Sequence, residues 1–264
     1  MITFGSLFAG IGGFDLGFER AGMACKWQLE IGKQQSSVLS NHFPGVPNYG
    51  DVTKFTEYEL PTVDVICGGD PCPRHSRART TTACSSPDLS GYFLAVVGGL
   101  RPRWVVRENV LASTVEHFDV AMAALGYGTI IIRLDSAQAT CQSRKRDFII
   151  GCFGVSRAKL GEVFSDAESG AGAYASRFAT QQVVACLTTR RQRYDSRDNY
   201  VYESAGFRIL GSEERERFGG FPTGWTTGFS ETTRAMMMGN AIVPQVAQFI
   251  GEHIMEVEES NEIC

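Results

Sequence analysis

The sequence predicts an α/β protein built on a largely parallel β-sheet. Short apolar runs alternate with longer helical stretches through the first 150 residues or so, which is the pattern of strands joined by crossover helices. The run VDVICGG is apolar through almost all of its centre, as expected for a strand that helices cover on both faces. With 264 residues, 43% of them hydrophobic, the chain is long enough for one large domain, or one large and one small domain.

The expected elements follow one another from the first residues, and Gly22 and Pro44 end the first two helices. The predicted strands are ITFGSLF (2–8), CKWQLEI (25–31), VDVICGG (63–69), RWVVREN (103–109), and a closing pair, TIIIRL (129–134) and DFIIGCFGV (147–155). The predicted helices are FDLGFERAG (14–22), KQQSSVLSNHF (33–43), SPDLSGYFLAVVGGL (86–100), VEHFDVAMAALGYG (115–128) and VPQVAQFIGEHIMEV (243–257).

The apolar rhythm breaks at about residue 156 and resumes with GFRILGSEERERFGGFP, near residue 206. The intervening polar, Gly-, Ser- and Arg-rich stretches indicate a small irregular domain or an inserted loop region. The predicted organisation is a main domain of residues 1–154 plus 230–257, a small domain of residues 155–229, and an acidic tail of residues 258–264.

Cysteine spacing and hydropathy exclude several protein classes. The eight cysteines are scattered without a C-x-x-C pair, and the four histidines have no ligand-like spacing, so we expect neither a disulfide framework nor a zinc site. No apolar run reaches the roughly 18 residues of a membrane span, and the N-terminus lacks the pattern of a signal peptide. We therefore expect a soluble, cytoplasmic protein without a membrane partner.

The charge distribution favours a phosphate-binding face although the net charge is −4. Twenty of the 25 basic residues are arginines, the side chain suited to bidentate phosphate and base contacts. Residues 74–107 hold six arginines against one acid, and residues 177–197 hold five against one. Such basic islands on an acidic protein are typical of a nucleic-acid-binding surface, the alternative being solvated surface arginine.

A glycine-rich loop, Phe8-Ala9-Gly10-Ile11-Gly12-Gly13, joins the first strand to the first helix. Glycines at this position let a cofactor approach the backbone at a helix N-terminus, although an ordinary tight turn has the same composition. Glu30 ends the second strand, where a carboxylate commonly binds ribose hydroxyls. Asp51 follows the second helix and is placed to accept from an adenine amino group. In this order, the three features favour an adenosine-containing cofactor over isolated surface acids.

Cys72 is the candidate nucleophile. It lies between two prolines at the carboxyl end of an apolar strand, where open α/β sheets place ligands. Arg74, His75, Arg77 and Arg79 follow closely, and a thiol among cations has a lowered pKa and more thiolate. The alternative is a buried structural cysteine beside a phosphate-binding patch.

An acid and two arginines are expected near this thiol. Glu108 ends the next strand, and neighbouring strand ends of a parallel sheet share one edge, so Glu108 is expected close to Cys72. Arg144 and Arg146 precede a later strand and alternate along the chain, which puts both on one side. Taken separately, Glu108 is typical of a helix N-terminal acid, and the arginines of a solvated turn.

Together and in this order, the segments resemble the cytosine-C5 DNA methyltransferase family. FAGIGGF is similar to its cofactor loop, PC to its nucleophile motif, ENV to its acid motif, Q-x-R-x-R to its base-binding arginines, and GNAIV (239–243) to its final motif. The resemblance runs from about residue 3 to 255 and fails only between 155 and 205. It implies a Rossmann-like S-adenosylmethionine-dependent methyltransferase sheet with a small irregular target-recognition domain.

The resemblance also implies a reaction on double-stranded DNA with S-adenosylmethionine as cofactor. Cys72 would add to C6 of a flipped-out cytosine while Glu108 holds and protonates N3, and C5 would then accept the methyl group. Arg146, with Arg144 nearby, would bind the base O2 and the backbone, and Asn109 would steady the acid motif.

Cofactor and DNA contacts follow from the same resemblance. Phe8 would stack on adenine, Glu30 would bind ribose, Asp51 the adenine amine, and Asn240 would close the pocket. The implied cofactor-binding residues are Phe8, Gly10, Ile11, Gly12, Gly13, Glu30, Ile31, Asp51, Val52, Asn240 and Ala241. The implied DNA-binding residues are Arg74, His75, Ser76, Arg77, Arg79, Arg190, Arg191 and Arg193.

The chain departs from the family at the nucleophile loop and in size. Pro73 and His75 stand where relatives have Gln and Phe, Ala241 replaces a small hydroxyl residue, and only about 50 residues remain for target recognition. We expect a compact, phage-like, monomeric member with a short or relaxed target sequence. Three alternatives stay open: a tRNA-methylating enzyme of the same family, transfer of a modified anionic group to DNA cytosine, and a catalytically silent DNA-binding relative.

Overall fold

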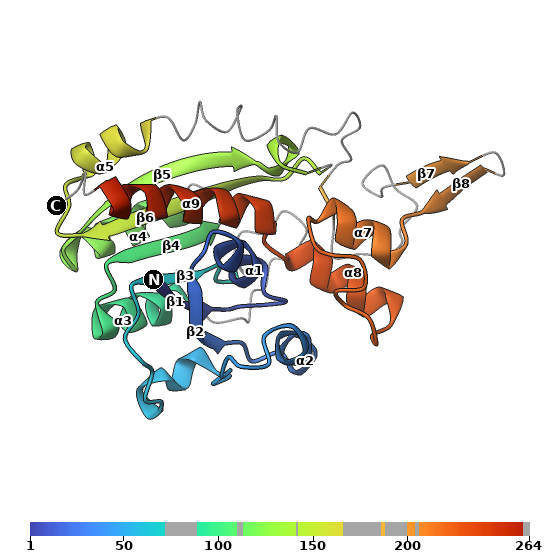
Figure 1. The fold of residues 1–264 in the computed structure, drawn as a ribbon, viewed down its shortest axis with the longest axis horizontal. Coiled ribbons are helices and arrows are strands. Elements are labelled where there is room, and N and C mark those ends of the chain that lie inside the picture. Colours follow the sequence, from blue (N-terminus) through green and yellow to red (C-terminus); the bar gives the residue numbers. More distant parts are fainter. Residues whose placement is uncertain are drawn as a thin grey trace.

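The computed structural model describes residues 1–71, 89–109, 113–140, 142–165, 186–187, 200–203 and 206–260 (Figure 1). The strands are β1 (Thr3–Leu7), β2 (Ala24–Leu29), β3 (Val65–Gly68), β4 (Trp104–Asn109), β5 (Tyr127–Asp135), β6 (Lys145–Phe153), β7 (Tyr200–Glu203) and β8 (Gly206–Ile209). The helices are α1 (Gly13–Arg20), α2 (Lys33–His42), η1 (Val52–Glu57), α3 (Ser90–Leu100), α4 (Ser113–Ala124), η2 (Ser136–Gln138), α5 (Arg157–Val163), α7 (Ser212–Phe218), α8 (Glu231–Asn240) and α9 (Pro244–Ser260).

The described residues form a six-stranded sheet in the order β2-β1-β3-β4-β6-β5. Strands β2, β1, β3 and β4 are parallel, whereas β6 runs antiparallel to both β4 and β5. The start of β6 therefore lies at the same edge of the sheet as the carboxyl ends of the parallel strands. The predicted α/β class, the strand order along the chain and the closing pair are confirmed.

Helices cover both faces of this sheet, as the apolar centre of β3 predicted. On one face, α1 and α9 lie side by side (Figure 1) and pack Phe18 and Ile250 against the strands. On the other face, α3 and α4 contribute Phe93 and Phe118 to a second core cluster. A third cluster joins α2 to the segment around Trp225 and α8.

Small residues let α1 and α9 approach each other closely. A Cβ at Gly17 would stand 2.4 Å from the Pro244 carbonyl oxygen, and one at Gly251 would stand 2.9 Å from the Ala21 side chain. The two helices therefore bury each other, which places the loop before α1 beside the segment before α9.

Helix α9 extends beyond the predicted end. It continues to Ser260, so the first three residues of the predicted acidic tail, 258–260, are helical. The physical reason is Glu258, which accepts from Arg103 Nε at 2.5 Å and from Trp104 Nε1 at 2.9 Å.

Within the described residues, three α-helices were not predicted, α5, α7 and α8, and neither were strands β7 and β8. The predicted helix at 115–128 also ends earlier, at Ala124, because Gly126 has a φ of +92° and Tyr127 begins β5. Within the described ranges, none of the helices has both the length and the apolar content to span a bilayer. The division into domains that the sequence indicates stays a prediction.

Candidate active site

At two positions of the loop between β1 and α1, the backbone has a conformation that glycine adopts more readily than other residues. Gly10 and Gly12 have φ of +59° and +84°, in the left-handed region. Gly10 donates its N–H to Glu30 Oε2 at 2.8 Å, and Gly32 donates to Glu30 Oε1 at 2.6 Å. One carboxylate at the end of β2 therefore holds the glycine loop and the start of α2 together.

Burial raises the pKa of Glu30, and the N–H groups of Gly32 and Gly10 act in the opposite direction. The sequence predicts that Glu30 and the glycine loop lie at one site, and the hydrogen bond from Gly10 to Glu30 brings them into contact. It also gives Glu30 a structural task, since both carboxylate oxygens bind backbone N–H groups.

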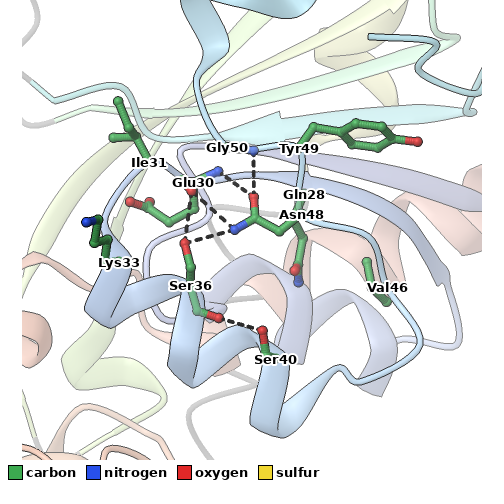
Figure 2. Close-up of a pocket in the computed structure, with 10 residues that line it drawn as sticks. All are labelled: Gln28, Glu30, Ile31, Lys33, Ser36, Ser40, Val46, Asn48, Tyr49 and Gly50. Carbon is green, nitrogen blue, oxygen red and sulfur yellow. Dashed lines mark hydrogen bonds between the residues drawn. The ribbon is translucent and has the colours of Figure 1, made fainter.

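A groove opens beside Glu30 between β2 and α2 (Figure 2). Asn48 lies within it and accepts from the N–H groups of Glu30 (3.0 Å) and Gly50 (3.1 Å), while its amide donates to Ser36 Oγ (2.9 Å). The residues that line the groove are Gln28, Glu30, Ile31, Lys33, Ser36, Ser40, Val46, Asn48, Tyr49 and Gly50.

Two of the predicted cofactor residues, Glu30 and Ile31, line this groove, and Ile31 is 70% exposed. Asp51 lies just beyond it and caps η1, with Oδ1 accepting from the backbone and the hydroxyl of Thr53. Val52 is buried in the core. Asn48 and Ser36 were not predicted as site residues from the sequence. The Asn-x-Gly spacing of Asn48 and Gly50, which is typical of a turn closed by the Asn side chain, was the signal for Asn48.

The segment after α8, and Trp225 in the segment before α8, both lie against the glycine loop. A Cβ at Gly13 would stand 2.3 Å from the Ile242 carbonyl oxygen, and Trp225 Nε1 donates to the Ile11 carbonyl at 2.8 Å. Asn240 ends α8 and Ala241 is its C-cap residue, so both stand directly before this contact. The fold thus brings the predicted final motif to the predicted cofactor loop.

A second, smaller cavity contains the predicted acid and both predicted arginines. Arg146 Nε lies 2.9 Å from Glu108 Oε1, in an ion pair that lacks hydrogen-bond geometry. Both atoms are buried and neither has a hydrogen-bond partner among the described residues, so each can still bond a further group. The residues that line the cavity are Glu108, Leu134, Ser136, Arg144, Arg146, Phe148, Ile242, Val243 and Val246.

Arg144 is fixed in place around the same cavity. Its Nη1 donates to the Gly239 carbonyl at 3.0 Å and contacts Cys186 Sγ at 3.6 Å, while its backbone N–H donates to Asp135. Burial and the neighbouring Arg146 lower the pKa of Arg144, and Glu108 opposes them. The cavity therefore combines one carboxylate with two guanidinium groups.

The end of β3 lies beside Glu108, as the shared strand edge predicted. Gly68 pairs with Arg107, and a Cβ at Gly69 would stand 2.9 Å from Glu108 Oε2. Asn109 ends β4 and is buried. The predicted nucleophile and DNA contacts lie outside the described residues: Cys72, Arg74, His75, Ser76, Arg77, Arg79, Arg190, Arg191 and Arg193.

A largely parallel sheet, with a glycine loop after β1 and an acid at the end of β2, is typical of the α/β proteins that bind nucleotide-like cofactors at the carboxyl ends of their parallel strands. Within this class, the chain belongs to the C-5 cytosine-specific DNA methylase family, whose model matches residues 2–164 and 157–256.

Two relatives and one solved structure illustrate the similarity. The Type II methyltransferase M.HgiBI of Herpetosiphon aurantiacus is 34% identical over 158 residues, which cover 55% of this chain and 36% of that relative. The Type II methyltransferase M2.BsuMI of Bacillus subtilis is 24% identical over 97% of this chain and 76% of its own length. The crystal structure of a DNA modification methyltransferase encoded within an E. coli prophage superposes with a TM-score of 0.69 at 17% identity, covering 98% of this chain and all of that chain.

Proposed function

We propose that the protein methylates C5 of cytosine in double-stranded DNA with S-adenosylmethionine as the methyl donor. The observation that carries this proposal is the Glu108–Arg146–Arg144 cavity, which lies beside Gly69, three residues before Cys72. Family membership supports the same reaction.

The residues of the cavity match the chemistry of a cytosine ring. Cytosine C5 is a weak nucleophile until a thiolate adds to C6, and the electron pair displaced toward N3 then needs a proton. Glu108 is placed to hold that proton at N3, because its buried Oε1 lacks a hydrogen-bond partner within the described structure. Arg146 and Arg144 supply N–H donors to O2, the carbonyl oxygen of the base. After C5 is methylated, loss of the C5 proton and cleavage of the Cys72–C6 bond restore the ring.

The residues around the glycine loop fit the methyl donor. The left-handed Gly10 has only the Phe8 carbonyl oxygen, at 3.9 Å, near the place where a side chain would stand, so its backbone is open to a ligand. Glu30 offers a carboxylate beside a polar groove. When bound, S-adenosylmethionine supplies an electrophilic methyl group. Ile31, which is exposed at the groove, offers an apolar surface for the adenine ring.

We further propose that the active protein is a monomer with residues 1–154 and 230–257 as its catalytic part and residues 155–229 as its target-recognition part. A cytosine that is stacked and paired within a duplex cannot enter so enclosed a cavity, so the target base is flipped out of the helix. The similarity to a prophage-encoded methyltransferase favours action on DNA in a bacterial cytoplasm.

The test is direct. Wild-type protein is incubated with S-adenosylmethionine and mixed-sequence duplex DNA, or with tRNA, and the digested nucleosides are weighed by mass spectrometry. We expect 5-methylcytosine from DNA, none with Cys72→Ala, and a strongly reduced rate with Glu108→Gln. Cys25→Ala removes a thiol from β2 outside the site and is the matched control. Methylation of tRNA alone, a cytosine of another added mass, or product from Cys72→Ala would contradict the proposal.

A further inference from the structure

A buried ion pair joins the ends of β3 and β4. Arg107 Nε donates to Asp70 Oδ1 at 2.5 Å, and Arg107 Nη2 donates to Asp70 Oδ2 at 2.8 Å. The two side chains are only 1% and 4% exposed, and the guanidinium also lies 4.2 Å from the ring centroid of Phe118 on α4. A two-point contact between a planar guanidinium and a carboxylate fixes orientation as well as distance.

Stability alone does not account for this pair. Removing two charges from water is costly, and well-packed apolar residues at such positions are often as stabilising. The place of the pair in the chain accounts for it better. Asp70 stands two residues before Cys72, and Arg107 stands directly before Glu108.

The pair therefore links the segment that leads into the nucleophile to the strand that carries the acid. Asp70 is bound two residues before Cys72 along the chain, so the pair fixes the last described part of the segment that leads to Cys72. Neighbouring side chains on a strand point to opposite faces, so Arg107 binds Asp70 on one face while Glu108 meets Arg146 on the other.

We propose that Asp70 and Arg107 are positioning residues, whose buried pair sets where the Cys72 segment leaves the sheet relative to Glu108. The inference rests on the proposed function, because it assigns the pair a role in the attack of Cys72 on cytosine. Neither residue is expected to touch the base.

The decisive variant is the double substitution Asp70→Leu with Arg107→Met, which removes both charges and leaves neither polar group buried without the other. We expect its melting temperature and its affinity for S-adenosylmethionine to stay near those of the wild type. We expect kcat to fall about 10- to 100-fold with little change in the KM for DNA, since misplaced reacting groups lose rate at that scale. Amide hydrogen exchange in residues 65–71 should become faster, whether or not DNA is present.

Two further variants separate positioning from charge balance and from general loss of stability. Arg107→Lys keeps the charge and loses the two-point contact, so kcat should still fall. Glu258→Gln breaks the ion pair at the opposite end of β4 and should leave kcat and exchange in residues 65–71 unchanged.

Full activity in Arg107→Lys, or wild-type kcat and exchange in the double variant, would overturn the inference. If the double variant does not fold, Arg107→Lys decides the question alone. Absence of methylation by the wild type would count against the proposed function instead, and the exchange comparison would still report whether the pair holds residues 65–71.

Discussion

The carbonyl oxygen of Ile242 lies against Gly13, where a Cβ would stand only 2.3 Å away. This contact joins the first turn of α1 to the segment between α8 and α9. Because the near atom belongs to the backbone, it cannot swing aside as a side chain would. The predicted cofactor loop and the predicted final motif are therefore parts of one surface.

Gly13→Ala should consequently destabilise the protein and weaken cofactor binding. Overpacking at such a contact costs about 1–3 kcal/mol, measurable by urea unfolding, and titration with S-adenosylmethionine should give a weaker affinity. Gly161→Ala in α5 is the control, because nothing lies within 4 Å of its added methyl group and alanine favours a helix. Equal stability of Gly13→Ala and the wild type would contradict the contact.

Gly69→Ala should reduce activity much more than stability. The added methyl group would stand 2.9 Å from Glu108 Oε2, the end of a flexible side chain that can move at little cost to the fold. The displaced carboxylate would no longer meet Arg146 as it does now, so we expect kcat for DNA methylation to fall while the melting temperature changes little. Gly45→Ala, with nothing within 4 Å, serves as the comparison. Unchanged kcat in Gly69→Ala would argue that the position of Glu108 is unimportant.

Asp15 should make stability depend on pH. It is fully buried on α1, where burial raises its pKa above the ordinary value near 3.8, against hydrogen bonds from Gln28 and Ser6. The folded state thus binds this proton more tightly than the unfolded state, so the contribution of Asp15 is complete below about pH 4 and is lost as pH rises through the raised pKa.

Asp15→Asn should remove that loss. We expect the free energy of unfolding of the variant, measured in urea across acidic to neutral pH, to improve relative to the wild type as pH increases. Parallel pH profiles for the two proteins would show that Asp15 does not titrate abnormally.

Glu30→Gln should weaken cofactor binding by disturbing the glycine loop. A glutamine has one amide oxygen, so either Gly10 or Gly32 would face an NH₂ donor in place of an acceptor. A buried donor left without an acceptor costs about 1–3 kcal/mol. Calorimetric titration with S-adenosylmethionine should show the lower affinity, with exposed Gln34→Ala on α2 as control. An unchanged affinity would remove Glu30 from the cofactor site.

The order of the strands and most helices could be predicted because their apolar periodicity is local. Helix α8 could not, since its sequence ETTRAMMMGN has no clear apolar face. It is stabilised by tertiary contacts, with Met237 and Met238 packed in the cluster that also contains Trp225. The cap that starts it, Ser230, was readable in principle.

In the site, too, some features could be predicted from the sequence and others depend on tertiary contacts. Glu108 and the arginines come together because motif order and strand direction bring them to one edge. The Asp70–Arg107 pair depends on side-chain geometry between two strands, which spacing along the chain does not encode. Asp51 was expected to bind adenine, and the structure adds a second task, capping η1 through Thr53.

The packing of α1 on α9 has a consequence for synthesis of the chain. Translation proceeds from the N-terminus, and α1 leaves the ribosome long before α9 exists. Until then Phe18 stays uncovered, because the residues that pack around it in the finished fold include Ile250 and other residues of α9. The nascent chain therefore cannot complete its first core until α9 has emerged, and a product truncated before α9 would be exposed to proteases and chaperones.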